Sequence, residues 1–421
     1  MGEQSNVSSK TCVSNKNLQN RIPEIHFSNS NVWKSYKLKE FLSFYSTNSL
    51  SRSNLNYENG NIKNIHYGDI HTKFPSIINC ETEEIPYINL DIDSSRIKED
   101  SFCKDSDLII ADASENYDDI GKAIELINVG NQKIVAGLHT ILARDTEDIT
   151  VSGFKGYLFQ TDNLKKQIKI ITNGISVLGI SKNNLKNLYV NIPSKEEQEK
   201  IVRFLFLIDR KIDLLEKTLG LYEKNKKYFI ENIFSQKLRF EGFPKEWDFM
   251  YLKDIGTFFR GHSYNSNNVV EDGLLVLRSN NIQNGKLIFD KDRLQFVNKP
   301  CNDELKLIRN DIVICMSNGT KSLVGKTAQY DGSYPNELTV GAFCSIFRSN
   351  APLAKYIFQT EYFKKYLYIL LAGTNINNIK NSDLEKFIIK LPGYEEQEKI
   401  TKFLNNFNKK IELIKLKKRK I

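Results

Sequence analysis

The residues of this chain that could carry catalysis fall into three small groups, and none has the spacing that its chemistry requires. In the first group, residues 319–327 read GTKSLVGKT, which is similar to a phosphate-binding loop. A P-loop has four residues between its first glycine and the GK[ST] triplet, whereas five stand here. No clear helix pattern follows Thr327, so a turn is favoured over an ATP site.

The other two groups have simpler explanations. Glu196, Glu197 and Glu199 stand at the start of a predicted helix, where the helix dipole stabilises negative charge. His66 and His71 have no cysteine or carboxylate at a recognisable zinc spacing. The chain also lacks the Asn/Asp-Pro-Pro-aromatic stretch that would hold an adenine amino group for methyl transfer. We therefore expect a non-catalytic protein with no metal and no cofactor of its own.

Composition narrows the class of partner. The formal net charge is +9 and the pI is about 8.9. A basic balance suits an anionic partner, and we favour nucleic acid over a membrane, with a basic soluble protein as the plain alternative. The six cysteines form no CxxC pair, which argues against structural zinc and fits reduced thiols in the cytoplasm. We expect residues 1–21 to be a disordered polar tail, and no apolar run reaches membrane-spanning length.

One long amphipathic stretch organises the chain. Residues 192–238 contain no proline after Pro193, and their apolar residues recur in alternating steps of four and three. Such a repeat, with charges around it, indicates a helix that packs against another helix as a coiled coil. Ser194 can cap its start, and Glu197 can close a capping box. Only Lys226 interrupts the apolar seam, which comprises Ile201, Leu205, Ile208, Ile212, Leu215, Leu219, Tyr222, Phe229 and Ile233.

A second copy of the same pattern supplies the partner helix. Residues 390–405 read KLPGYEEQEKITKFLN and match NIPSKEEQEKIVRFLF at 191–206, an offset of 199. Upstream, DLIIA at 107–111 matches DIVIC at 311–315 at an offset of 204. The two tryptophans, Trp33 and Trp247, are 214 residues apart, and we expect each to anchor the packing of its own repeat. The second seam comprises Ile400, Leu404, Phe407, Ile411 and Ile414.

Each repeat therefore holds a globular part followed by a long helix. The globular parts contain β-rich runs such as KIVAGLHTILA and LTVGAFCSIFR between Gly/Asn/Asp turns, with short helices near 157–171 and 355–371. We predict an α+β fold: two mixed α/β domains alternate with two long helices that pair as an antiparallel coiled coil, in a pseudo-two-fold internal repeat. The predicted bounds are 22–190 and 239–389 for the domains, and 191–238 and 390–421 for the helices.

The second helix is predicted to be the shorter one. Ile421 aligns with Tyr222, so Phe229 and Ile233 have no equivalent seam residue opposite them in the repeat. Three explanations are open: the pairing is staggered, these residues contact the second globular domain, or the chain is a shortened member of its family.

These blocks resemble the specificity (S) subunit of type I restriction-modification enzymes, from about Ile22 to the end of the chain. The resemblance rests on the proline-then-EEQEKI helix starts at 193–201 and 392–400. It also rests on YGDIH, SENYDDIGKAIEL, AGLHTILAR and GISVLGISKNNLKNL in the first half, and on LRSNNIQNGK, DIVICMSNGTKSLVGKTA and GTNINNIKNSDLEKF in the second.

The resemblance implies two target-recognition domains that read the two halves of a split target in double-stranded DNA, with helices that set the gap. It implies no catalysis by this chain. Adenine methylation would belong to modification subunits, two per chain, docked on helix surfaces that include Arg203, Lys211 and Lys217. Cleavage and translocation would belong to a restriction subunit, and S-adenosylmethionine, ATP and magnesium would bind to these partners. The alternative is a recognition subunit of another multisubunit phage-defence methylation system.

Sequence reading requires side chains at base edges, and Asn, Gln, Arg and Lys are suited to paired hydrogen bonds in the major groove. Polar, turn-rich loops supply the candidates, although a solvated turn is an equally good interpretation of each residue. In the first half they are His71, Thr72, Lys73, Ser114, Glu115, Asn116 and His139. In the second half they are Arg260, His262, Tyr264, Arg278, Ser279, Asn280, Asn281, Ser317, Asn318 and Lys321.

Overall fold

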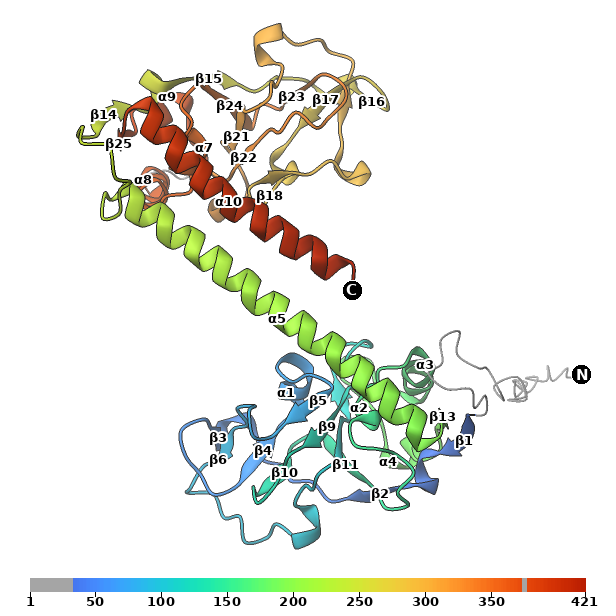
Figure 1. The fold of residues 1–421 in the computed structure, drawn as a ribbon. Coiled ribbons are helices and arrows are strands. Elements are labelled where there is room, and N and C mark those ends of the chain that lie inside the picture. Colours follow the sequence, from blue (N-terminus) through green and yellow to red (C-terminus); the bar gives the residue numbers. More distant parts are fainter. Residues whose placement is uncertain (1–32, 373–376) are drawn as a thin grey trace, which may run out of the picture. The chain divides into compact units, whose positions relative to one another are not determined.

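The chain folds into two compact units, residues 1–210 and 211–421, which are described separately (Figure 1). The structure is a computed structural model that describes residues 33–372 and 377–421. The predicted polar tail at 1–21, the lead-in of the first domain up to residue 32 and the Gly373 end of the GTNINNIKNSDLEKF block lie outside the described residues.

The first unit is built on a five-stranded sheet with an apolar core on each face. Its order is β2 (Leu42–Tyr45), β11 (Thr140–Asp145), β7 (Leu108–Ala111), β9 (Ala123–Ile127) and β5 (Ile77–Asn79). In β7, Leu108 and Ile110 belong to one buried cluster, whereas Ile109 and Ala111 belong to the other. Alternate side chains of a strand point to opposite faces, so a strand buried on both faces must be apolar throughout.

Smaller sheets and helices complete this unit. A four-stranded sheet has the order β10 (Ile134–Ala136), β4 (Lys63–Ile65), β6 (Tyr87–Ile88) and β3 (Leu55–Asn56). Two strand pairs are β1 (Lys34–Lys37) with β13 (Tyr189–Ile192), and β8 (Ala113–Ser114) with β12 (Leu178–Gly179). The helices are α1 (Tyr67–Thr72), α2 (Phe154–Leu158), α3 (Asp162–Ile171), α4 (Lys182–Leu185) and the start of α5 (Lys195–Phe234).

The second unit repeats this plan. Its main sheet has the order β15 (Gly256–Arg260), β24 (Cys344–Ser349), β21 (Ile312–Cys315) and β22 (Thr327–Gln329). A second sheet has the order β16 (Val269–Val270), β20 (Phe296–Val297), β17 (Leu274–Leu277) and β23 (Leu338–Val340). The strand pairs are β14 (Asp248–Tyr251) with β25 (Ile388–Leu391), and β18 (Ile282–Gln283) with β19 (Lys286–Leu287). The helices are α6 (Leu252–Ile255), α7 (Ala354–Ile357), α8 (Glu361–Ala372), α9 (Asn381–Glu385) and α10 (Tyr394–Arg419), together with the end of α5.

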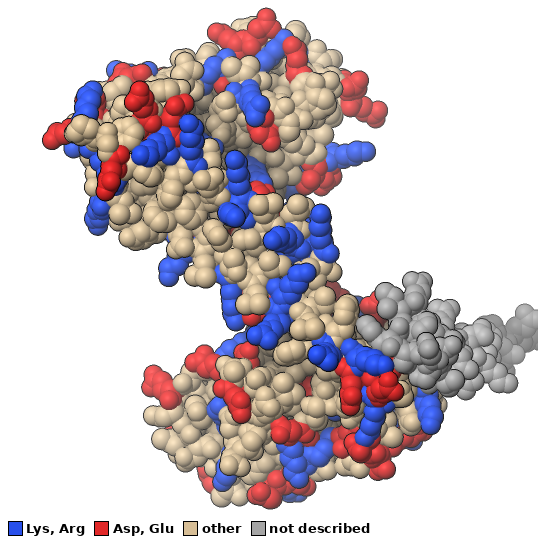
Figure 2. Space-filling model, in the orientation of Figure 1, with Lys and Arg blue, Asp and Glu red and all other residues tan. Residues whose placement is uncertain are grey.

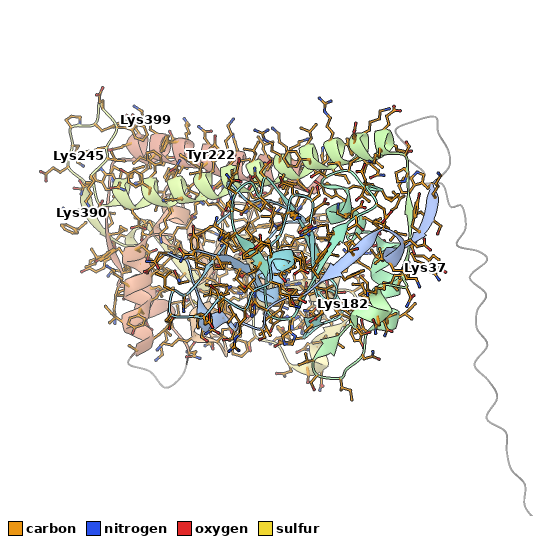
Figure 3. The ribbon with its side chains drawn as sticks, turned by 90° about the horizontal axis from the view of Figure 1, so that it is seen from below. Lys37, Lys182, Tyr222, Lys245, Lys390 and Lys399 are labelled. Atoms are coloured by element: carbon orange, nitrogen blue, oxygen red, sulfur yellow. The ribbon has the colours of Figure 1, made fainter. Side chains whose placement is uncertain are left out.

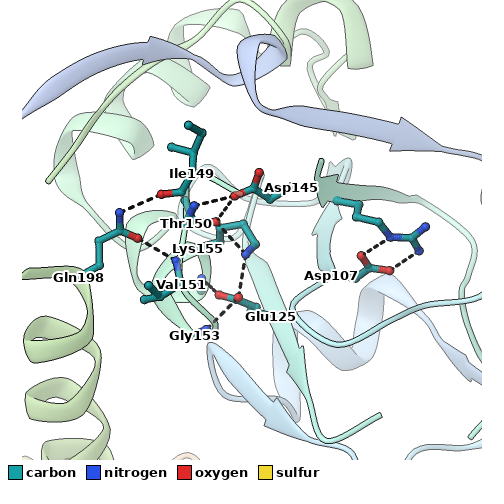
Figure 4. Close-up of polar contacts among 11 residues, drawn as sticks. Asp107, Glu125, Asp145, Ile149, Thr150, Val151, Gly153, Lys155 and Gln198 are labelled. Carbon is teal, nitrogen blue, oxygen red and sulfur yellow. Dashed lines mark hydrogen bonds and ion pairs between the residues drawn. The ribbon is translucent and has the colours of Figure 1, made fainter. Parts of the chain in front are cut away.

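A buried ion pair occurs at the same place in both repeats. The guanidinium of Arg144 on β11 donates two 2.7 Å hydrogen bonds to the carboxylate of Asp107, just before β7 (Figure 4). Arg348 on β24 donates to Asp311, just before β21, at 2.9 and 2.8 Å. Arg348 and Asp311 lie 204 residues after Arg144 and Asp107, as the sequence offset predicts. The internal repeat is therefore confirmed down to individual side-chain contacts.

The two helices pair antiparallel within the second unit, as predicted. Glu216 of α5 forms an ion pair with Lys418 of α10, and Glu223 forms one with Lys415 at 3.2 Å. Nearer the end of α5, the ring of Phe229 lies 5.0 Å from that of Phe403. Residue numbers therefore rise along α5 as they fall along α10. Tyr222, marked on α5 in Figure 3, contacts Phe407 with ring centroids 6.2 Å apart.

This antiparallel order also resolves the apparent mismatch in helix length. Phe229 does have partners, because its ring contacts both Phe403 and Phe407, and Ile233 is buried in the core of the second unit. Of the three explanations, contact with the second globular domain is confirmed for both residues, because Phe229 also packs against this core. Repeat alignment compares equivalent positions, whereas in an antiparallel pair the end of one helix faces the start of the other.

The apolar seams serve the domains as well as the helix pair. Ile201 packs against a core cluster of the first unit, and Ile400 and Leu404 belong to the core of the second. Ile411 and Ile414 are buried, Phe407 makes ring contacts, and Leu205, Ile208, Ile212 and Leu215 are half-buried. A helix that starts by docking on its own domain uses its first seam residues there.

Polar contacts fix each helix to the domain before it. Gln198 donates to the carbonyls of Ile149 and Pro193 at 3.0 Å and accepts from the Val151 amide (Figure 4). Gln397, the equivalent residue, donates to the carbonyl of Pro392 at 2.9 Å. The hydroxyl of Tyr157 donates to Asp209 at 2.8 Å, and its counterpart Tyr356 contacts Asn408 at 3.1 Å. Each helix is therefore held against its domain by hydrogen bonds at its start and again further along, at Asp209 or Asn408.

The tryptophans and the glycine-rich loop behave as packing and turn elements. Trp247 is 4% exposed and lies in the core of the second unit, with its ring edge-on to Phe234, whereas Trp33 is half-buried. A short 3-10 turn (Lys321–Leu323) and strand β22 follow Gly319, so the GTKSLVGKT loop is not followed by a helix. Within the described ranges, no helix is both long and apolar enough to cross a membrane.

Replacing Arg348 with alanine should lower the free energy of unfolding of the second unit by about 3–5 kcal/mol, because the buried Asp311 carboxylate would lose its partner. Urea unfolding can be followed by Trp247 fluorescence in a Trp33→Phe background. The matched control is Arg293→Ala, whose partner Asp290 is 59% exposed, and it should cost less than about 1 kcal/mol. Equal effects of the two substitutions would contradict a structural role for the buried pair.

Candidate nucleic-acid interface

A polar pocket of about 580 Å³ lies in the second unit at the carboxyl ends of two parallel strands, β17 and β23. Arg278 directly follows β17, and residues 341–343 directly follow β23. Adjacent parallel strands end at the same edge of a sheet, so the polar residues that follow them converge. Ser317 and Asn318, which follow β21, reach the same pocket.

The pocket brings together seven of the ten residues selected from the second half of the sequence. They are His262, Tyr264, Arg278, Ser279, Asn280, Ser317 and Asn318. Two others, Arg260 at the end of β15 and Lys321, are exposed outside the pocket. Asn281 is fully buried, and its side chain accepts from the Arg278 amide and donates to the carbonyl of Ile288. Asn281 therefore shapes the turn that presents its neighbours and cannot contact DNA itself.

Two buried nitrogens of the pocket have no hydrogen-bond partner among the described residues. They are Nε2 of His262, a residue that is 7% exposed, and Nε of Arg278. Burial lowers the pKa of His262, and nearby Lys299 lowers it further, so its imidazole is neutral at pH 7. Since unpaired buried polar groups are costly, these two atoms mark positions where a polar ligand would restore lost hydrogen bonds.

Two lining residues were missed by sequence reasoning. Phe343 is 70% exposed at the rim of the pocket, and Gln295 lies in its wall. Phe343 lies in the β-rich run LTVGAFCSIFR, whose apolar pattern does not distinguish it from strand residues. Gly341 could have indicated that Phe343 is exposed, because a glycine directly after a strand favours a turn, and turn residues often face the solvent. The carbonyl of Phe343 accepts from the amides of Met316 and Ser317, which fixes the rim.

The first unit has an equivalent site at the carboxyl ends of the parallel strands β4 and β10. His66 follows β4, and His139 follows β10 with a φ of 53°. Tyr67 lies between the histidines, with its ring centroid 5.6 Å from His71 and 5.3 Å from His139. Nδ1 of His139 lies 3.4 Å from Asp112, and Nε2 of His71 is buried without a partner among the described residues.

Two histidines of this site, His66 and His71, are shifted toward the neutral form by their surroundings. Burial lowers the pKa of His66 and of His71. Neutral imidazoles carry one donor and one acceptor each, which suits hydrogen bonds to base edges more than charge pairing with phosphate. Burial also raises the pKa of Asp112 from its ordinary value, partly offset by His139.

The remaining candidates of the first half are engaged locally. Thr72 donates to the carbonyl of Gly68 within α1, and Lys73 donates to the carbonyl of Glu84. The side chain of Asn116 bonds within its own turn, to Asp118 and Asp119. Ser114 is buried and accepts from the Asn116 amide, whereas Glu115 is exposed. Of the candidates in the first half, only His71 and His139 contact the ring of Tyr67.

The two sites share one backbone frame. The amide of His262 donates to the carbonyl of Val340 at 2.7 Å, and the amide of Asn48, 214 residues earlier, donates to that of Ala136 at 3.1 Å. Arg278 and His66 occupy the same place after their strands, as do Phe343 and His139. Neither site has a group of three or more metal-ligating side chains among the described residues. The arrangement can form hydrogen bonds and apolar contacts, which is the chemistry of direct readout.

Comparisons with known proteins identify a family for this chain. The model of a family described as type I restriction modification DNA specificity domain matches residues 31–220 and 244–421. The StySPI specificity subunit of Salmonella potsdam and the EcoKI specificity subunit of Escherichia coli K12 are each 34% identical over 171 residues. That match covers 38% of this chain and 36% of each relative, so the chain spans little more than a third of their length. The MjaVIII specificity subunit of Methanocaldococcus jannaschii is 27% identical over 63% of this chain and 66% of its own.

Solved structures have the same fold. The S subunit of a type I restriction-modification system from M. genitalium has a TM-score of 0.61 at 14% identity, covering 95% of this chain and 96% of that one. A chain from a structure on complex assembly of the type I system has a TM-score of 0.51 at 15% identity, covering 95% and 94%.

Gly261 allows its backbone to approach closely that of Gly341, which lines the pocket. A Cβ atom there would lie 2.1 Å from the carbonyl oxygen of Gly341. Gly261→Ala should therefore lower the free energy of unfolding of the second unit by about 1–3 kcal/mol. Gly319, also in the pocket wall, has open space around it, and Gly319→Ala should change stability by less than about 0.5 kcal/mol. Urea unfolding of both variants tests the difference, and equal midpoints would contradict the close packing.

Proposed function

Because the chain belongs to the type I restriction-modification DNA specificity family, we propose that it reads a bipartite sequence in double-stranded DNA, one half with each domain. The observation that carries this proposal is the duplicated site at the ends of paired parallel strands, where one backbone frame holds different side chains. Different side chains on a common frame would read different bases, so the two halves of the target should differ. The chain would act as the non-catalytic recognition subunit.

The second site supports a specific mode of reading. Arg278 has a free Nε in the pocket, and a guanidinium can donate two parallel hydrogen bonds to O6 and N7 of guanine. Asn280 offers the amide pattern that suits adenine, whereas the amide of Asn318 already donates to Ser279 and accepts from the Thr320 amide. Phe343 at the rim can contact a thymine methyl group. The first site would use Tyr67 and its neighbouring histidines in the same position.

We further propose that the helices set the gap between the two half-sites and hold the modification subunits. On α5, Leu214, Leu221 and Tyr228 recur every seven residues and are 55%, 60% and 55% exposed. An apolar stripe with this period suits a partner helix. Two modification subunits per chain would bring S-adenosylmethionine, and a restriction subunit would bring ATP and magnesium chemistry.

Exchange of a whole domain tests the modular proposal. Replacing residues 33–190 with those of another family member should change one half of the methylated target and leave the other half unchanged. Sequencing of adenine methylation in cells that carry the complete system gives the readout. The reciprocal control replaces residues 248–391 and should change only the other half. A change in both halves after either exchange would refute the model.

Arg278→Ala should weaken binding of the correct duplex by about 10- to 100-fold and relax discrimination at one base pair, since a bidentate contact is worth roughly 1–3 kcal/mol. Competition binding of the assembled complex against a library of duplexes measures both effects. The matched control is Arg260→Ala, an exposed arginine outside the pocket. Discrimination unchanged at every position in Arg278→Ala would show that another group reads the second half-site.

A further inference from the structure

A second pocket in the second unit is strongly basic. It has a volume of about 720 Å³ and lies where α5 and α10 meet α7 and the edge strand β22. Seven lysines line it against three acidic residues. Lys415 pairs with Glu223 at 3.2 Å, and Lys286 pairs with Glu412. Figure 2 shows lysine and arginine side chains gathered over the helices of this region.

Three of these lysines have no ion-pair partner in the described part of the chain. They are Lys226 on α5, Lys326 before β22 and Lys355 on α7, and all three are half-buried. Burial, together with the charges of Lys355 and Lys415 and against the opposing effect of Glu223, lowers the pKa of Lys226 to about 8. Burial also lowers the pKa of Lys355. The ammonium groups of Lys226 and Lys355 are therefore held near one another while neither forms an ion pair, which is costly unless an anion joins them.

Lys226 is the one residue that interrupts the apolar seam of α5. Its ammonium group lies 5.9 Å from the ring centre of Tyr356 on α7. The ammonium group of Lys355, also on α7, lies 5.1 Å from the same ring centre. An apolar residue at this position would continue the seam and avoid the cost of burying a charge. The lysine therefore has no evident role in helix pairing, and its charge points to a bound partner.

We propose that this pocket binds a phosphate-bearing anion, with Lys226 and Lys355 as its charge partners. A phosphate group offers several acceptor oxygens and more than one negative charge, which matches two neighbouring ammonium groups better than a single carboxylate does. Asn284, Gln329 and Asn408 in the pocket wall add neutral polar groups. The phosphate could belong to the DNA backbone or to a free polyphosphate, and the chemistry of the site is the same for both.

The site belongs to the second half of the chain. The counterpart of Lys355 at the offset of 199 is Gly156, which has no side chain. The counterpart of Lys326 at the offset of 204 is Lys122, whose ammonium donates to the carbonyl of His71 at 2.7 Å. This inference does not depend on base reading, because no residue of this pocket lines the polar pocket described above.

Calorimetric titration of the full chain with pyrophosphate tests the proposal. Lys226→Met and Lys355→Met keep most of the side-chain volume without the charge, and each should weaken pyrophosphate binding about tenfold or more. Lys226→Met should also raise the thermal unfolding midpoint of the free protein, which excludes misfolding as the cause of lost binding. The matched controls are Lys365→Met and Lys402→Met, exposed lysines outside the pocket, and both should bind like the unaltered chain.

A second experiment, with duplex DNA in place of pyrophosphate, identifies the source of the phosphate. If the backbone occupies the pocket, Lys226→Met should reduce the slope of log affinity against log salt by about one for duplex DNA. An unchanged slope together with lost pyrophosphate binding assigns the site to a free polyphosphate. The proposal is overturned if neither pyrophosphate nor DNA binding responds to the pocket variants. It is equally overturned if the chain binds an acidic peptide there and no pyrophosphate.

Discussion

A buried charge pair underlies each half of this protein. Asp107 and Asp311 have essentially no exposed surface, and each is held by an arginine from the adjacent strand through two short hydrogen bonds. A third hydrogen bond from each arginine reaches the carbonyl of Phe102 or of Lys306, so the pair also fixes the loop that precedes the sheet. Such a pair tolerates little change, because the loss of one partner leaves a buried charge. Two of the strands it joins, β11 and β24, begin directly after His139 and Phe343 of the two polar sites.

The frame is shared, while its contents differ between the halves. His66 is replaced by Arg278 at the end of one strand, and His139 by Phe343 at the end of the next. The interior differs too: the first unit buries Glu125 against Lys155 at 2.9 Å, where the second has Gln329 and Ala354 at the offset positions (Figure 4). Recognition surfaces that vary on a fixed backbone frame allow a protein to change what it reads without changing how it folds.

Much of the fold was predictable from the sequence, because repeats and helical periodicity are local patterns with long signals. The polar sites were predictable in part, since polar residues directly after buried apolar runs mark strand ends. The burial of individual neighbouring residues could not be predicted. Asn280 and Asn281 are neighbours in one short turn, yet the first is exposed and the second fully buried, and no local signal separates them. Phe343 looked like core because its neighbours are core. The partners of Phe229 depended on helix direction, which repeat alignment does not encode.

The closure of the second unit has a consequence for synthesis on the ribosome. Its core includes Ile230 and Ile233 of α5 and also Ile400 and Leu404 of α10, and strand β14 pairs with β25. The first unit pairs its own ends, β1 with β13, long before α10 is translated. At typical elongation rates, the end of α5 waits on the order of ten to forty seconds for α10. During that interval its aromatic face has no completed core to enter, so a nascent chain would be most vulnerable to aggregation and chaperone capture between the folding of its first and second halves.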